Sequence, residues 1–174
     1  MFHPDGGSVE KSVSIDLKNS HPFDLLCYDF DGVMTDNRVY VMQDGTETVA
    51  VNRSDGLAIA ALRHVGVTQM IMSTEENPVV NARAAKLKIP VLQGLGDKAK
   101  ALKAYVSDKG IDLTRTAFIG NDINDLNVMR IVGFPVAPND AYPTILDIAK
   151  HVTRAPGGAG VIREFCDTFY PGVI

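Results

Sequence analysis

Two carboxylates stand two residues apart at the end of a short apolar run. Asp29 and Asp31 follow residues 25–28 and open the run 29–36, which reads Asp-Phe-Asp-Gly-Val-Met-Thr-Asp. Carboxylate oxygens suit Mg²⁺, and a carboxylate can also attack a phosphoryl group to form an aspartyl-phosphate. We predict that Asp29 is this nucleophile and that Asp31 protonates the leaving oxygen and later activates water. The alternative is a solvated acidic turn that caps a helix.

Three more polar groups follow other apolar runs. Ser73 and Thr74 come after a predicted strand, where a hydroxyl can hold a phosphate oxygen or cap a helix. Lys98 near the first turn of a predicted helix can present a positive charge to phosphate, or remain a solvated surface lysine. Residues 120–125, Gly-Asn-Asp-Ile-Asn-Asp, offer several oxygens to a cation, or form an Asx-rich cap.

Strands that alternate with helices must position these groups. The apolar runs predict strands over residues 25–28, 67–72, 89–92, 116–119, 134–137 and 151–153. Capping and periodicity predict helices that begin at Ser54 or Asp55 and over residues 78–87, 97–106, 125–132, 142–150 and 160–170. An Asp-Gly pair predicts a β-hairpin with strands over residues 38–42 and 47–51.

This alternation favours an α/β fold with a parallel sheet and helices on both faces. Ligands of such sheets bind beyond the carboxyl ends of the strands. Asp29, Ser73 and residues 121–122 each fall just after a predicted strand, so we expect them to meet at one edge of the sheet. Residues 157–160, Gly-Gly-Ala-Gly, predict a flexible loop near the C-terminus.

The bulk composition limits the partners. The length of 174 residues suits one domain, which we place at residues 23–174 after a flexible tail at residues 1–22. The formal net charge of −4 gives no broad basic surface for nucleic acid or an anionic membrane. No run approaches the ~20 apolar residues of a membrane span. We therefore expect a cytoplasmic protein that binds neither nucleic acid nor a membrane.

The motifs, in this order, resemble the haloacid dehalogenase superfamily of phosphatases over about residues 23–170. They are similar to its capless subfamily of 3-deoxy-octulosonate 8-phosphate and nonulosonate 9-phosphate phosphatases. They also resemble the C-terminal domain of some acylneuraminate cytidylyltransferases. The residues that carry the resemblance are Asp29, Asp31–Val33, Thr35, Asp36, Arg53, Asp55, Gly56, Ser73, Lys98, Gly120–Asp122, Asn124, Asp125, Gly157, Gly158, Gly160, Arg163 and Glu164.

The resemblance implies a Rossmann-like fold without a cap domain, a Mg²⁺ cofactor, and a homotetramer in which the hairpin and neighbouring subunits close each site. It implies that Asp29 is the nucleophile and Asp31 the acid/base. The expected metal ligands are Asp29, Asp31 through its backbone carbonyl, and Asn121 or Asp122. The residues expected to bind the substrate and its phosphate are Ser73, Thr74, Lys98, Glu75, Arg53 and Asp55.

Three positions depart from the family pattern. Asn121 stands where aspartate is usual, and a neutral ligand should lower the affinity for Mg²⁺. Glu75 stands where the octulosonate enzymes typically carry arginine, which resembles the nonulosonate phosphatases instead. A positive residue there suits a substrate carboxylate, whereas glutamate suits polyol or amine contacts. Ala159 stands where arginine is frequent, so a contact to a neighbouring subunit's site is expected to be missing.

The sequence thus predicts a Mg²⁺-dependent phosphatase that hydrolyses a phosphomonoester of a 2-keto-3-deoxy nonulosonate or octulosonate. One alternative is a catalytically weak scaffold that holds an oligomer, like the cytidylyltransferase-linked domains, which Asn121 favours and the pair Asp29/Asp31 opposes. Another is a phospho-acceptor signalling domain, which would not need an acid/base two residues from the nucleophile.

Overall fold

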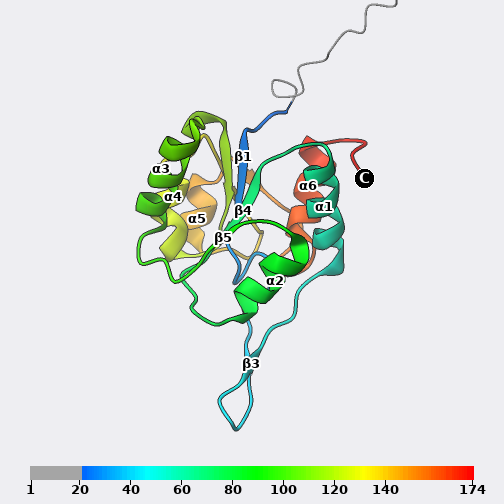
Figure 1. The fold of residues 1–174 in the computed structure, drawn as a ribbon, viewed down its shortest axis with the longest axis vertical. Coiled ribbons are helices and arrows are strands. Elements are labelled where there is room, and N and C mark those ends of the chain that lie inside the picture. Colours follow the sequence, from blue (N-terminus) through cyan, green and yellow to red (C-terminus); the bar gives the residue numbers. More distant parts are fainter. Residues whose placement is uncertain (1–20) are drawn as a thin grey trace, which may run out of the picture.

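Six short apolar runs form one parallel sheet in the computed structural model of the protein, which describes residues 21–174 (Figure 1). The strand order is β5-β4-β1-β6-β7-β8, and each neighbouring pair runs parallel. The three middle strands β1, β4 and β6 are buried along their whole length, because helices cover both faces. The strands are β1 (Leu25–Tyr28), β4 (Gln69–Met72), β5 (Val91–Leu92), β6 (Thr116–Ile119), β7 (Phe134–Ala137) and β8 (His151–Val152).

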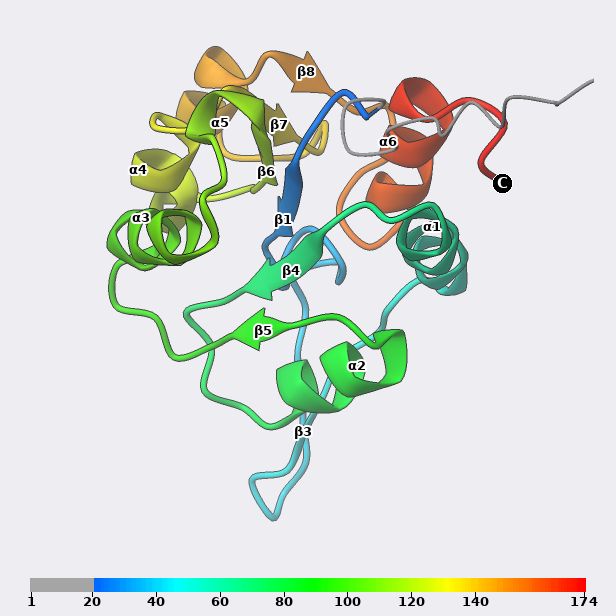
Figure 2. The same ribbon diagram turned by 45° about the horizontal axis from the view of Figure 1, so that its top comes forward.

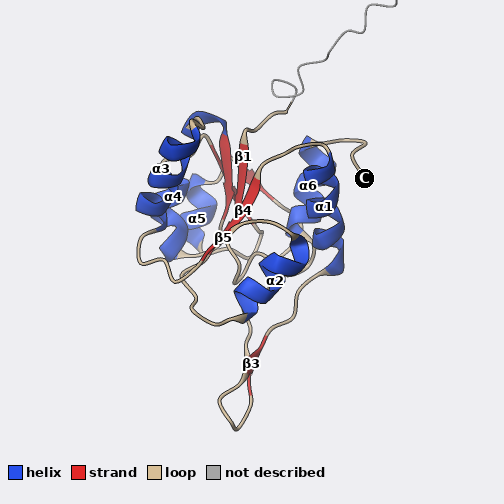
Figure 3. Cartoon of the chain, in the orientation of Figure 1, coloured by secondary structure: helices blue, strands red, loops and turns tan. Residues whose placement is uncertain are grey.

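Helices form a layer on each side of this sheet (Figures 2 and 3). On one side α1, α2 and α6 supply buried side chains to one hydrophobic core, and on the other side α3, α4 and α5 supply a second core. The α/β prediction is therefore confirmed. The helices are α1 (Arg53–His64), α2 (Val79–Leu87), α3 (Lys98–Lys109), α4 (Leu126–Met129), α5 (Pro143–Ile148) and α6 (Val161–Phe169), with 3-10 turns η2 (Leu113–Arg115) and η3 (Ile123–Asp125). Within residues 21–174, no helix combines the length and the apolar character needed to cross a membrane.

The predicted hairpin follows β1 and projects beyond the carboxyl ends of the middle strands (Figure 1). Its strands β2 (Tyr40–Val41) and β3 (Glu47–Thr48) are shorter than the predicted 38–42 and 47–51. A two-stranded ribbon with no layer packed on it has little to hold longer pairing. Nothing larger than this hairpin is inserted between the elements of residues 21–174, which agrees with the expected lack of a cap domain.

Several element boundaries differ from the prediction. The cap of α1 is Asn52, whose Oδ1 accepts the Ser54 N–H at 2.8 Å, and not Ser54 or Asp55. The predicted helix over residues 125–132 is a 3-10 turn followed by the short α4, because Asp122 caps the chain three residues earlier. α3 continues to Lys109, where a left-handed Gly110 ends it.

The predicted tail at residues 1–22 lies outside the described residues except for its last two. His21 already belongs to the domain: its Nε2 lies 2.9 Å from the Val65 carbonyl oxygen, and its own carbonyl accepts a 2.8 Å hydrogen bond from Arg115. Its ring also packs near Tyr170, with ring centroids 5.9 Å apart. The ordered domain therefore begins no later than His21.

Candidate active site

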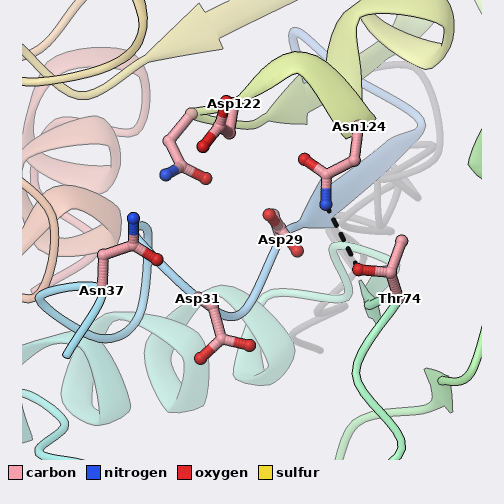
Figure 4. A pocket seen from close by; sticks show the side chains of 7 residues that line it. Asp29, Asp31, Asn37, Thr74, Asp122 and Asn124 are labelled. Carbon is pink, nitrogen blue, oxygen red and sulfur yellow. Dashed lines mark hydrogen bonds between the residues drawn. The ribbon is translucent and has the colours of Figure 1, made fainter. Parts of the chain in front are cut away.

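Polar side chains from three strand ends line a cavity of about 300 Å³. Asp29 follows β1 and Thr74 follows β4 (Figure 4). Asn121 follows β6, so three neighbouring strands of the sheet deliver residues to the cavity. The carboxyl ends of parallel strands meet at one edge, which is where such folds bind ligands. The full lining is Asp29, Asp31, Asn37, Thr74, Asn121, Asp122 and Asn124.

Asp29 is a buried carboxylate held by a buried ammonium. Its Oδ1 lies 2.7 Å from Lys98 Nζ and accepts the Phe30 N–H at 2.7 Å. Burial raises the pKa of Asp29 well above its usual value, the Asp125 carboxylate adds to this, and Lys98 lowers it. Burial also lowers the pKa of Lys98, but the two carboxylates outweigh it, so the pKa of Lys98 is raised and the ammonium stays charged. Lys98 therefore supports an ionised Asp29 from behind the cavity.

Asp125 anchors this arrangement, although no separate role was predicted for it. It is fully buried, its Oδ1 accepts from Lys98 Nζ at 2.6 Å, and its Oδ2 accepts the Asn121 N–H at 2.9 Å. One carboxylate thus fixes both the lysine and the loop that carries Asn121. A Cβ on Gly120 would lie 2.7 Å from Asp125 Cγ, so the glycine makes room for it. In the sequence, Asp125 was marked only by its place at the end of the 120–125 motif.

The Asn121 side-chain amide faces two other oxygen atoms beside the cavity. One of its two terminal atoms lies 2.8 Å from the Asp31 carbonyl oxygen and 3.3 Å from Asp29 Oδ2. Without a cation the amide nitrogen takes this place and donates to both oxygens, whereas the amide turned over would present its oxygen there and make three converging oxygens. Adjacent ligands of octahedral Mg²⁺, at ~2.1 Å from the ion, stand ~3 Å apart. The donor set and its spacing therefore fit a Mg²⁺ ion held by Asp29, the Asp31 carbonyl and Asn121.

Asp122 takes a different place. It is exposed, its Oδ1 accepts the Ile123 N–H at 2.7 Å, and it lines the cavity while capping η3. Among residues 21–174 no group of three His, Cys, Asp or Glu side chains is placed to hold a metal. The set beside the cavity contains only one such side chain, Asp29, since the other two donors are a backbone carbonyl and an amide. Asp122 can act on a bound cation through water.

The loop after β1 is braced from the far end of the chain. Gly32 has φ +78° and a Cβ there would lie 1.9 Å from the Asn121 amide, so only glycine fits. Gly158 N donates to the Val33 carbonyl at 3.0 Å, and a Cβ on Gly157 would lie 2.3 Å from the Gly32 carbonyl oxygen. The glycine loop expected to be flexible is therefore packed directly against the loop of Asp29.

Asp31 presents its carboxylate to the other side of the cavity. It is half-buried, and burial raises its pKa. The nearby carboxylates of Glu75 and Glu47 raise it further, while Lys98 and a hydrogen bond with Thr35 lower it. A carboxyl group whose pKa lies above its usual value is better suited to donate a proton near neutral pH.

Five of the six predicted substrate-binding side chains do not line the cavity directly. Ser73 is buried, and its Oγ accepts the Glu75 N–H at 3.0 Å within its own loop. Glu75 is exposed at the mouth, where its Oε1 accepts the N–H groups of the next two residues. Arg53 is exposed at the start of α1. Asp55 is buried between α1 and the start of α6. Of the predicted set, Thr74 alone lines the cavity directly, and Lys98 reaches it through Asp29.

Asp55 is a structural carboxyl. Its Oδ1 accepts the Arg163 N–H in the first turn of α6 at 2.9 Å, and its buried Oδ2 has no partner in residues 21–174. Burial raises the pKa of Asp55 from 3.8 to about 6, although the N–H groups of Arg163 and Ile162 and the Arg83 charge lower it. A folded-state pKa above the unfolded one means that the stabilisation is present at low pH and is lost as the pH rises through about 6.

We expect Asp55→Asn to flatten this dependence. Asparagine keeps an acceptor for Arg163 and cannot ionise, so the variant gains about 1.4 kcal/mol relative to the wild type between pH 5 and pH 8. Urea unfolding of both proteins across that range measures the difference. Parallel stability curves would show that Asp55 keeps its usual pKa in the folded protein.

Two asparagines of the cavity were not predicted as site residues. Asn37 adopts φ +63°, and its N–H donates to Thr35 Oγ1 at 3.2 Å, which turns the chain back to the cavity after Asp36. Asn124 donates from Nδ2 to Thr74 Oγ1 at 3.2 Å (Figure 4). No sequence signal marks Asn37, since its backbone conformation depends on the packed loop around it. Asn124 stood within the 120–125 motif, but its contact across the cavity joins separate strands.

The fold and this site define a hydrolase class. The chain belongs to the haloacid dehalogenase-like hydrolase family, whose profile matches residues 67–165. The family resemblance is therefore confirmed, and with it the predicted enzyme class, a phosphoric monoester hydrolase.

Particular relatives narrow the comparison. The chain is 38% identical over 144 residues to the 3-deoxy-D-manno-octulosonate 8-phosphate phosphatase of Yersinia pestis, covering 82% of this chain and 77% of that protein. A solved haloacid dehalogenase family hydrolase from Streptomyces avermitilis is 48% identical, with a TM-score of 0.85 over 87% of this chain and 88% of that one. The Moraxella catarrhalis octulosonate phosphatase, solved with magnesium, phosphate and its sugar acid, is 30% identical, with a TM-score of 0.82 over 88% of each chain. The chain is thus similar to phosphatases of sugar-acid phosphates.

Proposed function

We propose that this protein is a Mg²⁺-dependent phosphatase of a sugar-acid phosphomonoester that works through an aspartyl-phosphate on Asp29. The observation that carries the proposal is the position of the Asn121 side-chain amide, 2.8 Å from the Asp31 carbonyl oxygen and 3.3 Å from Asp29 Oδ2, with Lys98 Nζ 2.7 Å from Asp29 Oδ1. A bound Mg²⁺ would supply the positive charge that lets an anionic carboxylate approach an anionic phosphoryl group. The magnesium complex of the Moraxella catarrhalis relative supports the choice of metal.

The chain's own residues account for both steps of the hydrolysis. An Asp29 oxygen attacks phosphorus, the bond from phosphorus to the sugar oxygen breaks, and Asp31 donates its proton to that leaving oxygen. Asp31 then removes a proton from water, which attacks the aspartyl-phosphate. The bond from phosphorus to Asp29 breaks, and inorganic phosphate and the free carboxylate are restored. The raised pKa of Asp31 supports the first proton transfer.

We propose that the substrate is a nonulosonate 9-phosphate rather than an octulosonate 8-phosphate. Glu75 stands at the mouth, close enough to Asp31 to raise its pKa, and Glu47 of the hairpin adds to the same negative field. Asn77 joins the two segments, because its Nδ2 donates to Glu47 Oε2 at 3.0 Å. Both sugar acids carry a carboxylate, so a negative wall here disfavours only a binding mode that places this carboxylate beside Glu75. It favours a substrate whose hydroxyl or amine groups donate hydrogen bonds to Glu75, which is the contact we assign to the nonulosonate.

The experiment is a comparison of kcat/KM for the two sugar-acid phosphates at saturating Mg²⁺. We expect the wild type to prefer the nonulosonate by about tenfold, an activation difference of ~1.4 kcal/mol. Glu75→Arg should move the preference toward the octulosonate, while Glu76→Arg at the neighbouring exposed position serves as the charge control. A wild-type preference for the octulosonate would contradict the role given to Glu75.

We further propose a homotetramer assembled through the hairpin. Four consecutive apolar side chains there are 50–63% exposed, which is unusual for a short projecting ribbon. Four copies would cover these side chains and bring neighbouring chains to the mouth of each cavity. Sedimentation of the full chain reads out the number of copies. The four residues are Val39, Tyr40, Val41 and Met42.

The scaffold alternative has one observation in its favour, the neutral Asn121 among the three converging oxygens. Calorimetric titration with MgCl₂ separates the two functions. We expect binding together with hydrolysis of an aryl phosphate. If the protein neither binds Mg²⁺ nor hydrolyses the aryl phosphate, the result supports the scaffold function instead.

A further inference from the structure

A hydrogen bond joins two walls of the cavity. Asn124 Nδ2 donates to Thr74 Oγ1 at 3.2 Å, which connects the end of β4 to the η3 turn after β6 (Figure 4). Both side chains are exposed and both line the cavity that contains Asp29. The bond therefore lies outside the hydrophobic core and joins two side chains that face the cavity.

The bond restricts where the Thr74 proton can point. A hydroxyl has one proton and two acceptor lone pairs. Since one lone pair of Thr74 Oγ1 receives the Asn124 N–H, the proton cannot point at that nitrogen. Among residues 21–174 the structure gives this proton no acceptor, so it is free to meet a ligand oxygen.

The neighbouring hydroxyl, on Ser73, does not line the cavity. Ser73 Oγ accepts the Glu75 N–H at 3.0 Å, and Ser73 is only 1% exposed. Thr74 is therefore the hydroxyl of this loop that lines the cavity. An uncharged donor beside Asp29 can bind a phosphoryl oxygen without competing for the carboxylate as a cation would.

We propose that Asn124 is a positioning residue that aims the Thr74 hydroxyl proton at a phosphoryl oxygen held in front of Asp29. The inference rests on the proposed phosphatase function. Without Asn124 the hydroxyl would sample its three staggered orientations, and a donor fixed in advance binds better than one that must be ordered on binding. Asn124 therefore acts through Thr74.

The test is a double-mutant cycle with the full chain. Thr74→Val removes a hydrogen bond to a charged group, so we expect KM for an aryl phosphate and Ki for inorganic phosphate to rise together, roughly 10- to 100-fold. Asn124→Ala should raise both by up to about threefold, because the freed hydroxyl then samples three orientations. Thr74→Ser keeps the hydroxyl and should remain close to the wild type. Asn127→Ala, at an exposed asparagine of α4, is the control.

Coupling between the two positions decides the outcome. We expect the double variant to match Thr74→Val, because Asn124 has nothing left to orient. The proposal is overturned if Asn124→Ala has no effect alone, or keeps its full effect beside Thr74→Val. If the wild type hydrolyses no phosphomonoester, the proposed function fails. In that case the affinity for inorganic phosphate in the presence of MgCl₂ is measured by calorimetry for the same four proteins. If no phosphate binds, or if the effects of the two substitutions on its affinity simply add, the positioning role is overturned too.

Discussion

Replacing Asp29 with asparagine is expected to abolish turnover while the protein stays folded. The amide cannot attack phosphorus, so kcat should fall by at least ~10³-fold, or ~4 kcal/mol of activation free energy. The fold should survive because of the local charges. Asp29 and Asp125 share the single ammonium of Lys98, and the variant leaves one carboxylate with one ammonium.

The measurement is single-turnover hydrolysis with purified protein, alongside thermal unfolding. Asp108→Asn, at an exposed carboxylate on α3, is the matched control and should leave both unchanged. If Asp29→Asn retained substantial Mg²⁺-dependent activity, the nucleophile would have to be another residue.

Replacing Lys98 with methionine is expected to cost both stability and activity. The side chain is about the right length for its site, but two buried carboxylates would then face one another without a cation. Leaving such charges unpaired costs ~3–5 kcal/mol, which corresponds to a fall in Tm of roughly 10 °C for a chain of this size. Lys103→Met, on the exposed side of the same helix, should change stability by less than ~0.5 kcal/mol.

Measuring the Tm of Lys98→Met with and without Mg²⁺ also tests the proposed metal site. A cation held beside Asp29 would replace part of the missing positive charge, so the loss in Tm should be smaller with MgCl₂ than with a chelator. Equal losses under both conditions would argue against a metal site at the three converging oxygens. An unchanged Tm for Lys98→Met would mean that the lysine does not neutralise this pair.

Strand ends were the most predictable part of the site. Asp29 and Asn121 follow apolar runs that are unambiguous because both faces of the sheet are buried, and parallel strands must bring their carboxyl ends together. Local patterns could not decide which way each side chain turns. Ser73 and Asp55 carry suitable groups, yet nearby backbone N–H groups bind their side chains away from the cavity.

Burial separated another pair of similar signals. Lys98 and Lys100 stand in the same first turn of α3, and only Lys98 was predicted to present a charge to phosphate, with a solvated surface lysine as the alternative. Lys98 is 2% exposed because Asp125, from a distant part of the chain, draws its ammonium inward. Asn37 and Asn124 were not predicted as site residues, again because distant parts of the chain place them. Their positions depend on contacts between loops that are far apart in the sequence, which no local pattern reports.

The close contact of Gly157 and Gly158 with the loop of Asp29 has a consequence for the synthesis and folding of the protein. During synthesis Asp29 leaves the ribosome long before the glycines that brace its loop. Contacts so distant along the chain form late in folding, because a long loop must close first. We therefore expect a nascent chain to gain the proposed phosphatase activity only after residues 157–158 have packed against this loop.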